Sequence, residues 1–131
     1  MKTMIGFTLA AALFAPLAQA APEDLLTEYT RQGAGPFDAE AGRRGWAQIH
    51  PPRNGGERRS CASCHGEDLK RPGRHAKTGK PIEPLAVSVN PARLADARNV
   101  EKWLRRNCRW TLGRACTAQE KGDFVSYIRS Q

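Results

Sequence analysis

The stretch Cys61-Ala62-Ser63-Cys64-His65 constrains this chain more than any other. Two cysteines separated by two residues, with a histidine directly after, form C-x-x-C-H, the attachment signature of a c-type haem. The spacing suits this chemistry because both thiols can add to the two vinyl groups of one porphyrin while the histidine faces the iron. We therefore predict one covalently attached haem c held by Cys61 and Cys64, with His65 as the proximal iron ligand.

Two other interpretations of this motif are weaker. A thioredoxin-like redox pair would require a βαβ pattern around the cysteines, and the sequence shows none. A structural zinc site would require a second ligand pair at short spacing, but Cys108 and Cys116 are too far apart for the usual C-x₂₋₄-C. Haem attachment is the interpretation that the motif favours.

The first residues of the chain have the pattern of a secretory signal peptide. Lys2 precedes an apolar run over 4–17, and Ala18-Gln19-Ala20 forms a small-x-small cleavage site. Pro16 interrupts the run, which is also shorter than the about 20 residues that a membrane span needs. We predict that residues 1–20 are cleaved and that 21–131 form a monohaem cytochrome c domain without a membrane span. Such a protein would be exported, to the periplasm in a Gram-negative bacterium, where haem attachment and disulfide formation take place.

The chain is strongly basic, with 21 Lys and Arg against 13 Asp and Glu and a formal net charge of +8. A basic surface can attract nucleic acid, anionic membrane or an acidic protein. Export and the lack of a motif that combines aromatic and basic residues argue against nucleic acid. An acidic redox partner is the preferred interpretation, with scattered solvated charge as the alternative.

One domain of short helices is what this length and patterning support. Aromatic residues make up only 7% of the chain, so a buried porphyrin would supply apolar volume that the core lacks. We predict an all-α fold in which several short helices wrap around the haem. The predicted helices cover 22–31, 38–49, the haem motif, 99–108, and a last helix from about 117 onward.

The last two predicted helices have the clearest sequence signals. The first of them has a stripe of residues at i, i+3, i+4, i+7 and i+8, the spacing of one helix face. These residues are Val100, Trp103, Leu104, Asn107 and Cys108. The last helix opens on a capping box, Thr117-Ala118-Gln119-Glu120. Its predicted buried side is formed by Phe124, Val125, Tyr127 and Ile128.

The segment 66–91 is rich in Gly, Pro and basic residues, and it lacks a helical or strand period. So long an irregular stretch is reasonable if it wraps around a porphyrin. The carbonyl group of Pro81 or Pro84 is a candidate acceptor for the Nδ1 proton of His65, which would orient the imidazole ring.

The identity of the second iron ligand is the main question that the motif leaves open. Electron-carrying cytochromes c usually use a methionine thioether. Met1 and Met4 are the only methionines, and both lie in the predicted signal peptide. The remaining candidates are His50, His75, a lysine such as Lys77 or Lys80, Asn107, or no ligand at all.

Asn107 stands out because it is a polar side chain on the predicted buried stripe. A buried amide left without a partner costs about 1–3 kcal/mol, so it needs either a hydrogen bond near the helix end or coordination to iron through its oxygen. In an oxidising compartment the neighbouring Cys108 should pair with Cys116, and Gly113 would ease the turn between them. That disulfide would brace the end of the helix that carries Asn107.

With these residues laid out, the chain resembles the sphaeroides haem protein group of c-type cytochromes. The resemblance covers most of the chain after the signal peptide. An apparent extra residue around Arg74-His75-Ala76 departs from the family pattern and keeps His75 as a competing ligand. The matching stretches are 60–66, Thr78-Gly79-Lys80, Pro84-Leu85-Ala86, 100–104, Arg106-Asn107-Cys108, Gly113-Arg114 with Cys116, and Glu120-Lys121.

The resemblance implies a class I cytochrome c-like fold and a distal iron ligand at Asn107. The related cytochrome c″ has histidine at the equivalent place. Family members bind diatomic molecules when reduced and are thought to accept electrons from a di-haem cytochrome.

An amide oxygen is a hard donor that should hold ferrous iron poorly. Reduction would then open the distal site beside Trp103 to O₂, NO or CO. The leading hypothesis is an exported electron-transfer protein that binds O₂ or NO. If it is an enzyme, it would be a low-turnover reductase of one of these molecules. The first alternative is a closed carrier with His50 or His75 on the iron, and the second is a scavenging oxidase or peroxidase with His75 as its acid-base group.

Overall fold

The computed structural model describes residues 20–52 and 55–131, and this part of the chain is predominantly helical. The predicted signal peptide, 1–20, lies outside the described residues apart from Ala20, so it stays a prediction. No helix among the described residues is long and apolar enough to cross a membrane. The elements, in chain order, are α1 (Ala20–Arg31), α2 (Ala39–Ala47), α3 (Ala62–His65), β1 (Gly73–Arg74), β2 (Pro81–Ile82), the 3₁₀ helix η1 (Pro91–Leu94), α4 (Ala97–Thr111) and α5 (Ala118–Arg129).

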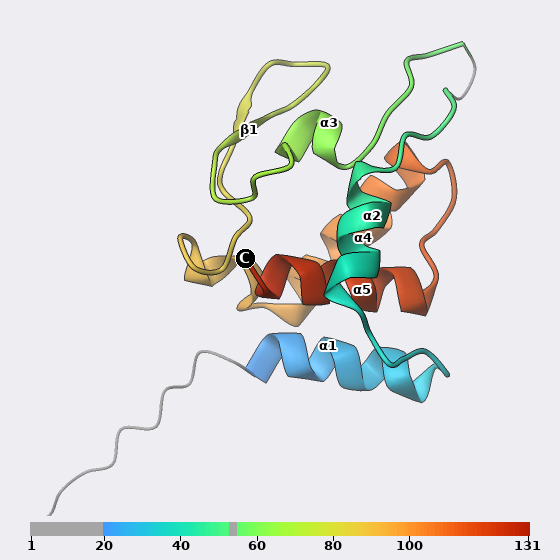
Figure 1. Ribbon diagram of the computed structural model, residues 1–131, viewed down its shortest axis with the longest axis vertical. Helices are drawn as coiled ribbons and strands as arrows, with labels where there is room; N and C mark the ends of the chain where they lie inside the picture. Colours follow the sequence, from blue (N-terminus) through green and yellow to red (C-terminus); the bar gives the residue numbers. More distant parts are fainter. Residues whose placement is uncertain (1–19, 53–54) are drawn as a thin grey trace, which may run out of the picture.

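Helix α5 lies at the centre of the molecule, with α1 on one side of it and α2 and α3 on the other (Figure 1). The predicted capping box is confirmed, because Thr117 Oγ1 accepts from the Glu120 N–H and the Glu120 carboxylate accepts from the Thr117 N–H. The four apolar residues predicted for its buried side are all buried. Glycine allows α2 to pack closely on this helix, since a Cβ at Gly42 would lie 2.1 Å from the Asp123 carbonyl oxygen.

Helix α2 is shorter than the predicted 38–49. Asp38 is its N-cap, as expected, but Gln48 is already extended and the helix ends at Ala47. Ile49 therefore leaves the helical face and is 57% exposed. Trp46, one turn earlier, remains buried in the core.

Helix α4 is longer than predicted at both ends. It starts earlier because the Asp96 carboxylate accepts from the N–H groups of Arg98 and Asn99, and it ends later, at Thr111. Val100, Cys108 and Thr111 form its buried side. Trp103 does not belong to that side and is 44% exposed. The predicted stripe was therefore only partly right, since Trp103 lies about 100° around the helix from Leu104.

The irregular segment between α3 and α4 folds back against the haem motif. Its two short strands pair in antiparallel fashion, Gly73 with Ile82 and Arg74 with Pro81. Gly73 is required at that place because a Cβ there would meet the Cys64 carbonyl oxygen at 2.3 Å. Leu69 is fully buried, and its carbonyl oxygen accepts from the Leu85 and Ala86 N–H groups, both at 2.9 Å.

Candidate haem-binding site

Helix α3 presents Cys61, Cys64 and His65 on a single helical turn. Ser60 and Ser63 cap this turn reciprocally, since each backbone N–H donates to the hydroxyl of the other, at 3.0 and 3.2 Å. Both motif cysteines are free thiols and are partly buried. Two thiols one turn apart, with an imidazole beside the second, are the donor set that haem c attachment requires.

Trp46 of α2 packs against the predicted proximal histidine. The ring centroids of Trp46 and His65 lie 5.4 Å apart, with the planes inclined at 46°. The indole N–H donates to the Gly66 carbonyl oxygen at 3.1 Å. Gly66 has φ of +75°, a conformation that favours glycine and lets the chain turn away directly after His65.

Burial makes His65 a neutral imidazole. Desolvation, assisted by the positive charge of Arg93, lowers the pKa of His65 to about 4. Neutral imidazole is the form that binds a metal. The Nδ1 atom is buried and has no hydrogen-bond partner among the described residues, so neither Pro81 nor Pro84 accepts from it.

Helix α4 carries the candidate distal residues. Trp103, Asn107 and Trp110 follow one another at i, i+4 and i+7, on the flank between the buried side of α4 and its basic side. Asn107 is half-buried, and its carboxamide forms no hydrogen bond within 20–52 and 55–131. Trp110 lies under the Arg59 guanidinium, 3.9 Å from carbon to ring centroid.

The turn between β1 and β2 contacts both the motif and α4. The Ala76 N–H donates to Cys64 Sγ at 3.3 Å, and the ring centroids of His75 and Trp110 lie 6.0 Å apart. The structure therefore brings α3 and the end of α4 to the same short turn.

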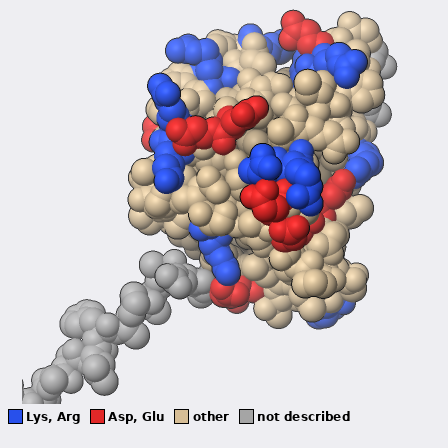
Figure 2. Space-filling view, viewed as in Figure 1, with Lys and Arg blue, Asp and Glu red and all other residues tan. Residues whose placement is uncertain are grey.

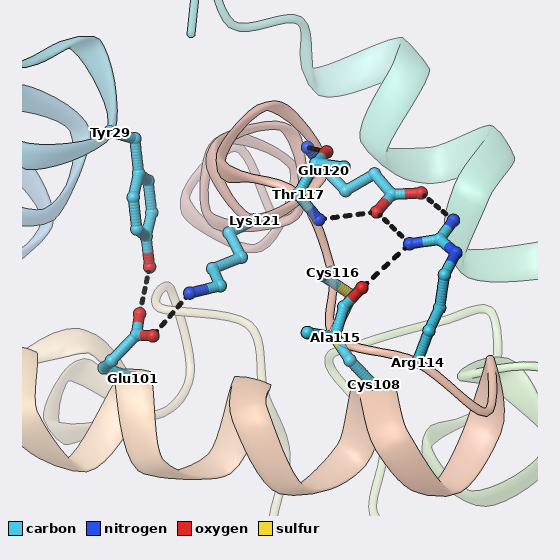
Figure 3. The surroundings of a disulfide bond; sticks show 9 residues. All are labelled: Tyr29, Glu101, Cys108, Arg114, Ala115, Cys116, Thr117, Glu120 and Lys121. Atoms are coloured by element: carbon cyan, nitrogen blue, oxygen red, sulfur yellow. Dashed lines mark hydrogen bonds and ion pairs between the residues drawn. A yellow bond between two sulfur atoms is a disulfide. The ribbon is translucent and has the colours of Figure 1, made fainter. Parts of the chain in front are cut away.

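Cys108 and Cys116 lie at bonding distance, with sulfur atoms 1.92 Å and Cα atoms 5.6 Å apart (Figure 3). Gly113, at φ of +77°, forms the turn between them. Arg114 then binds both carboxylate oxygens of Glu120, at 2.7 and 2.8 Å. This closed loop holds the C-terminal end of α4 against the start of α5.

The residues present fit a haem c. Two free thiols, a partly buried neutral imidazole with an unpartnered Nδ1, and an exposed tryptophan on α4 suit a large, flat, apolar group with an iron atom. Within the described residues, no cluster of three His, Cys, Asp or Glu side chains could hold a metal ion without such a group.

Comparison with known proteins identifies the family. Residues 32–128 match the family described as "Domain of unknown function (DUF1924)". Over 98% of its length, the chain is 40% identical to the complete cytochrome c-type protein SHP of Cereibacter sphaeroides. It belongs to the SHP family of c-type cytochromes. This confirms the predicted resemblance.

Two solved structures share the fold of this SHP-family cytochrome. The structure of oxidized SHP, described as an oxygen-binding cytochrome c, aligns with a TM-score of 0.77 at 40% identity over 84% of this chain and 96% of the other. The solution structure of Methylophilus methylotrophus cytochrome c″, described as giving insights into haem-ligand detachment, aligns with a TM-score of 0.69 at 31% identity over 82% and 90%. The predicted all-α, class I cytochrome c-like fold and the covalently attached haem c are confirmed.

The other two histidines of this SHP-family cytochrome make contacts of their own. His50 pairs with Arg59 in an isolated antiparallel bridge. His75 Nδ1 accepts from the Thr78 N–H at 3.1 Å. Their places neither assign nor exclude an iron ligand, so the ligand set is taken up below as a proposal.

Sequence reasoning missed three residues at the site: Trp46, Trp110 and Arg93. Trp46 packs against His65, Trp110 lies under the Arg59 guanidinium, and the charge of Arg93 acts on His65. Trp110 had a usable signal, since it continues the Trp103–Asn107 spacing by one turn. Trp46 and Arg93 had none, because both approach His65 from distant parts of the chain.

Proposed function

We propose that this monohaem c-type cytochrome transfers electrons and, when reduced, binds a diatomic molecule such as O₂ or NO in place of a weak Asn107 ligand. In this proposal Cys61 and Cys64 hold the haem covalently, His65 is the proximal ligand and Trp103 lines the distal side. The observation that carries the proposal is the half-buried Asn107 carboxamide, which has no hydrogen-bond partner among the described residues. The haem supplies a one-electron couple and, when its distal position is open, a binding site.

The chemistry of the amide explains why its bond would depend on oxidation state. A carboxamide oxygen is a hard donor that suits ferric iron better than ferrous iron. No methionine follows Met4, so no thioether from the predicted mature chain can replace it. The Cys108–Cys116 loop limits how far α4 can move, so the amide side chain rather than the helix is the part that swings away. The oxygen-binding SHP and the ligand-detaching cytochrome c″ support this interpretation.

An acidic protein, such as a di-haem cytochrome, is the electron donor we propose, and its docking surface is the basic side of α4. A groove of about 500 Å³ is lined by Lys102, Arg105, Arg106, Arg109 and Trp110. Among the described residues, none of these four cations has a carboxylate within ion-pair distance. Like charges at i, i+3 and i+4 destabilise a helix, so an acidic partner would relieve repulsion there.

The face shown in Figure 2 contrasts with this groove, because acidic and basic groups are interspersed on it. Several of the described cations are ion-paired, for example Arg43 with Glu40 and Arg114 with Glu120. We expect electrostatic steering of an acidic donor to act through α4 for this reason. The proposed periplasmic location, reached through signal peptide 1–20, is compatible with such a partner.

Optical and EPR spectra of the Asn107→Ala protein test the ligand assignment. We expect the ferric spectrum to lose the features of the amide-bound iron and to become that of a five-coordinate or water-bound iron. Binding of CO to the ferrous protein should persist. Asn107→His should give a different ferric spectrum, that of a low-spin iron with two imidazole ligands, because imidazole suits iron better than an amide oxygen does. Asn99→Ala, an exposed residue on the same helix, is the control. Unchanged ferric and ferrous spectra of Asn107→Ala would remove Asn107 from the iron.

The alternative of a closed carrier rests on His75, which lies beside Trp110 and next to the residue that contacts Cys64. A bis-His iron would show no spectral change over minutes when CO is added to the reduced wild-type protein, and His75→Ala would restore binding. Consumption of O₂ or NO under steady-state reduction would separate a low-turnover reductase from simple ligand binding.

A further inference from the structure

Trp110 belongs both to the basic groove on α4 and to the packing around the haem motif. It lines the groove together with four cations, none of which has a carboxylate within ion-pair distance among residues 20–52 and 55–131. Its ring lies under the Arg59 guanidinium, 3.9 Å from carbon to centroid, and is half-buried. The indole is therefore reachable from the groove while its position is held from within the protein.

Arg59 holds the indole in place. Its backbone is fixed to His50, because the His50 N–H donates to the Arg59 carbonyl oxygen at 2.7 Å and the Arg59 N–H donates to the His50 carbonyl oxygen at 3.2 Å. The buried Nε of Arg59 has no hydrogen-bond partner within the described part of the chain, which leaves the ring as the contact of this guanidinium. A positive charge against the indole opposes the removal of an electron from it. The ring can thus conduct an electron without being oxidised itself.

A series of contacts leads from Trp110 to Cys64. The ring centroids of Trp110 and His75 lie 6.0 Å apart, with the planes inclined at 39°. The imidazole is held by the Thr78 N–H, which donates to His75 Nδ1 at 3.1 Å. The next residue along the chain, Ala76, donates its N–H to Cys64 Sγ at 3.3 Å. In the proposed function this sulfur atom bonds the haem, so the contacts run from the basic groove to the atom that carries the haem.

We propose that Trp110 is the point at which an electron enters, from an acidic redox protein docked on the groove, and that the electron continues through His75 and the Ala76–Cys64 hydrogen bond. The inference rests on the proposed function, which supplies the haem on Cys64 and the acidic electron donor. The donor protein loses one electron and the iron changes from ferric to ferrous, while no bond is made or broken and no proton moves at these residues. The cations of the groove set the affinity of docking, and Trp110 sets the rate of transfer once the donor is bound.

Reduction of the ferric holoprotein by reduced flavodoxin, an acidic one-electron donor protein, separates these two roles. The rate measured against flavodoxin concentration gives a half-saturating concentration and a limiting rate. Trp110→Leu should lower the limiting rate several-fold at an unchanged half-saturating concentration, whereas Trp110→Phe, which keeps an aromatic ring, should stay close to wild type. Arg105→Gln/Arg109→Gln should raise the half-saturating concentration several-fold at an unchanged limiting rate. Arg31→Gln is the charge control, because it removes a cation at the end of α1, outside the groove.

The limiting rate decides whether the electron takes this route. A limiting rate in Trp110→Leu equal to that of wild type would overturn the route through Trp110, even if docking on α4 holds. If Trp110→Leu does not take up haem, His75→Ala breaks the same series of contacts in the short turn between β1 and β2. An unchanged limiting rate in His75→Ala would overturn the route as well.

Docking can be followed without electron transfer, by NMR of the wild-type ferric protein titrated with oxidised flavodoxin. The indole N–H signal of Trp110, identified from its loss in Trp110→Phe, should shift, while that of Trp46, which is only 5% exposed, should not. An unmoved Trp110 signal would overturn contact of the donor with this ring. If Arg105→Gln/Arg109→Gln also leaves the half-saturating concentration unchanged, the docking surface in the proposed function fails, whereas a shifted signal with an unchanged limiting rate in Trp110→Leu rejects the electron route alone.

Discussion

The Trp46 indole ring lies 5.4 Å from the His65 imidazole, centroid to centroid, and its N–H donates to the carbonyl group of the residue that follows His65. Phe124 and Tyr127 of α5 pack edge-on against the same indole, with centroids at 6.1 and 6.0 Å. The α2–α5 contact therefore supports the haem motif directly. Core packing and ligand orientation depend on the same side chain.

Trp46→Phe should lower the free energy of unfolding by about 1–3 kcal/mol, because it replaces a buried indole by a smaller ring and leaves the Gly66 carbonyl group without its donor. Urea denaturation of the ferric holoprotein measures this. Ile49→Ala is the control, because that side chain is mostly exposed and its loss should cost less than about 0.5 kcal/mol. Equal stability of wild type and Trp46→Phe would contradict the proposed support.

Glu101 joins three helices through one carboxylate (Figure 3). It accepts from the Tyr29 hydroxyl at 2.7 Å and pairs with Lys121, whose side chain is only 16% exposed. Glu101→Gln should cost about 1–3 kcal/mol in unfolding free energy, because the Lys121 ammonium loses its counter-charge while still largely buried. The double variant Glu101→Gln/Lys121→Met should recover part of that loss in a double-mutant cycle. Additive single losses would show that the pair is not coupled.

The Cys108–Cys116 pair should contribute about 2–3 kcal/mol, the loop-closure entropy of so short a loop in the chain-entropy model. Urea denaturation with and without dithiothreitol measures this contribution in wild type. Dithiothreitol should have no effect on a Cys108→Ser/Cys116→Ser protein, which serves as the control. A wild-type transition that does not respond to the reductant would show that the disulfide does not form, or does not stabilise the fold.

Stability in acid should depend on Glu120. Its hydrogen bonds to Arg114, and further to Thr117, lower the pKa of the Glu120 carboxyl below the unfolded value, despite partial burial. The stabilisation is therefore complete above the unfolded pKa of about 4.3 and is lost as the pH falls through the lower folded pKa. Glu120→Gln should lower the urea midpoint at neutral pH, where the stabilisation is complete, and flatten the fall of the midpoint below about pH 4.3. The same acid slope in wild type and variant would exclude this role.

The helices were predictable where their signals are local. Thr117 and Glu120 form the expected capping box, and the four apolar residues after them are buried, because both features depend only on helical spacing within α5. Boundaries were less predictable. Asp96 extends α4 backwards through its own side chain, and Gln48 ends α2 before Ile49 through a backbone angle that no residue type dictates.

The sequence by itself determined the chemistry of the chain: the two thiols and the imidazole on one turn, the lack of a methionine after Met4, and the family that the chain belongs to. These features follow from the identity of residues that are close in the sequence, and they do not depend on how the rest of the chain folds. Only the tertiary structure decided that Trp103 stays exposed, that Trp46 supports His65, and that Arg93 donates to the Pro84 carbonyl oxygen. The segment 66–91 has no periodic pattern, so its course, and every contact it makes with the motif, depends on packing between residues far apart in the chain.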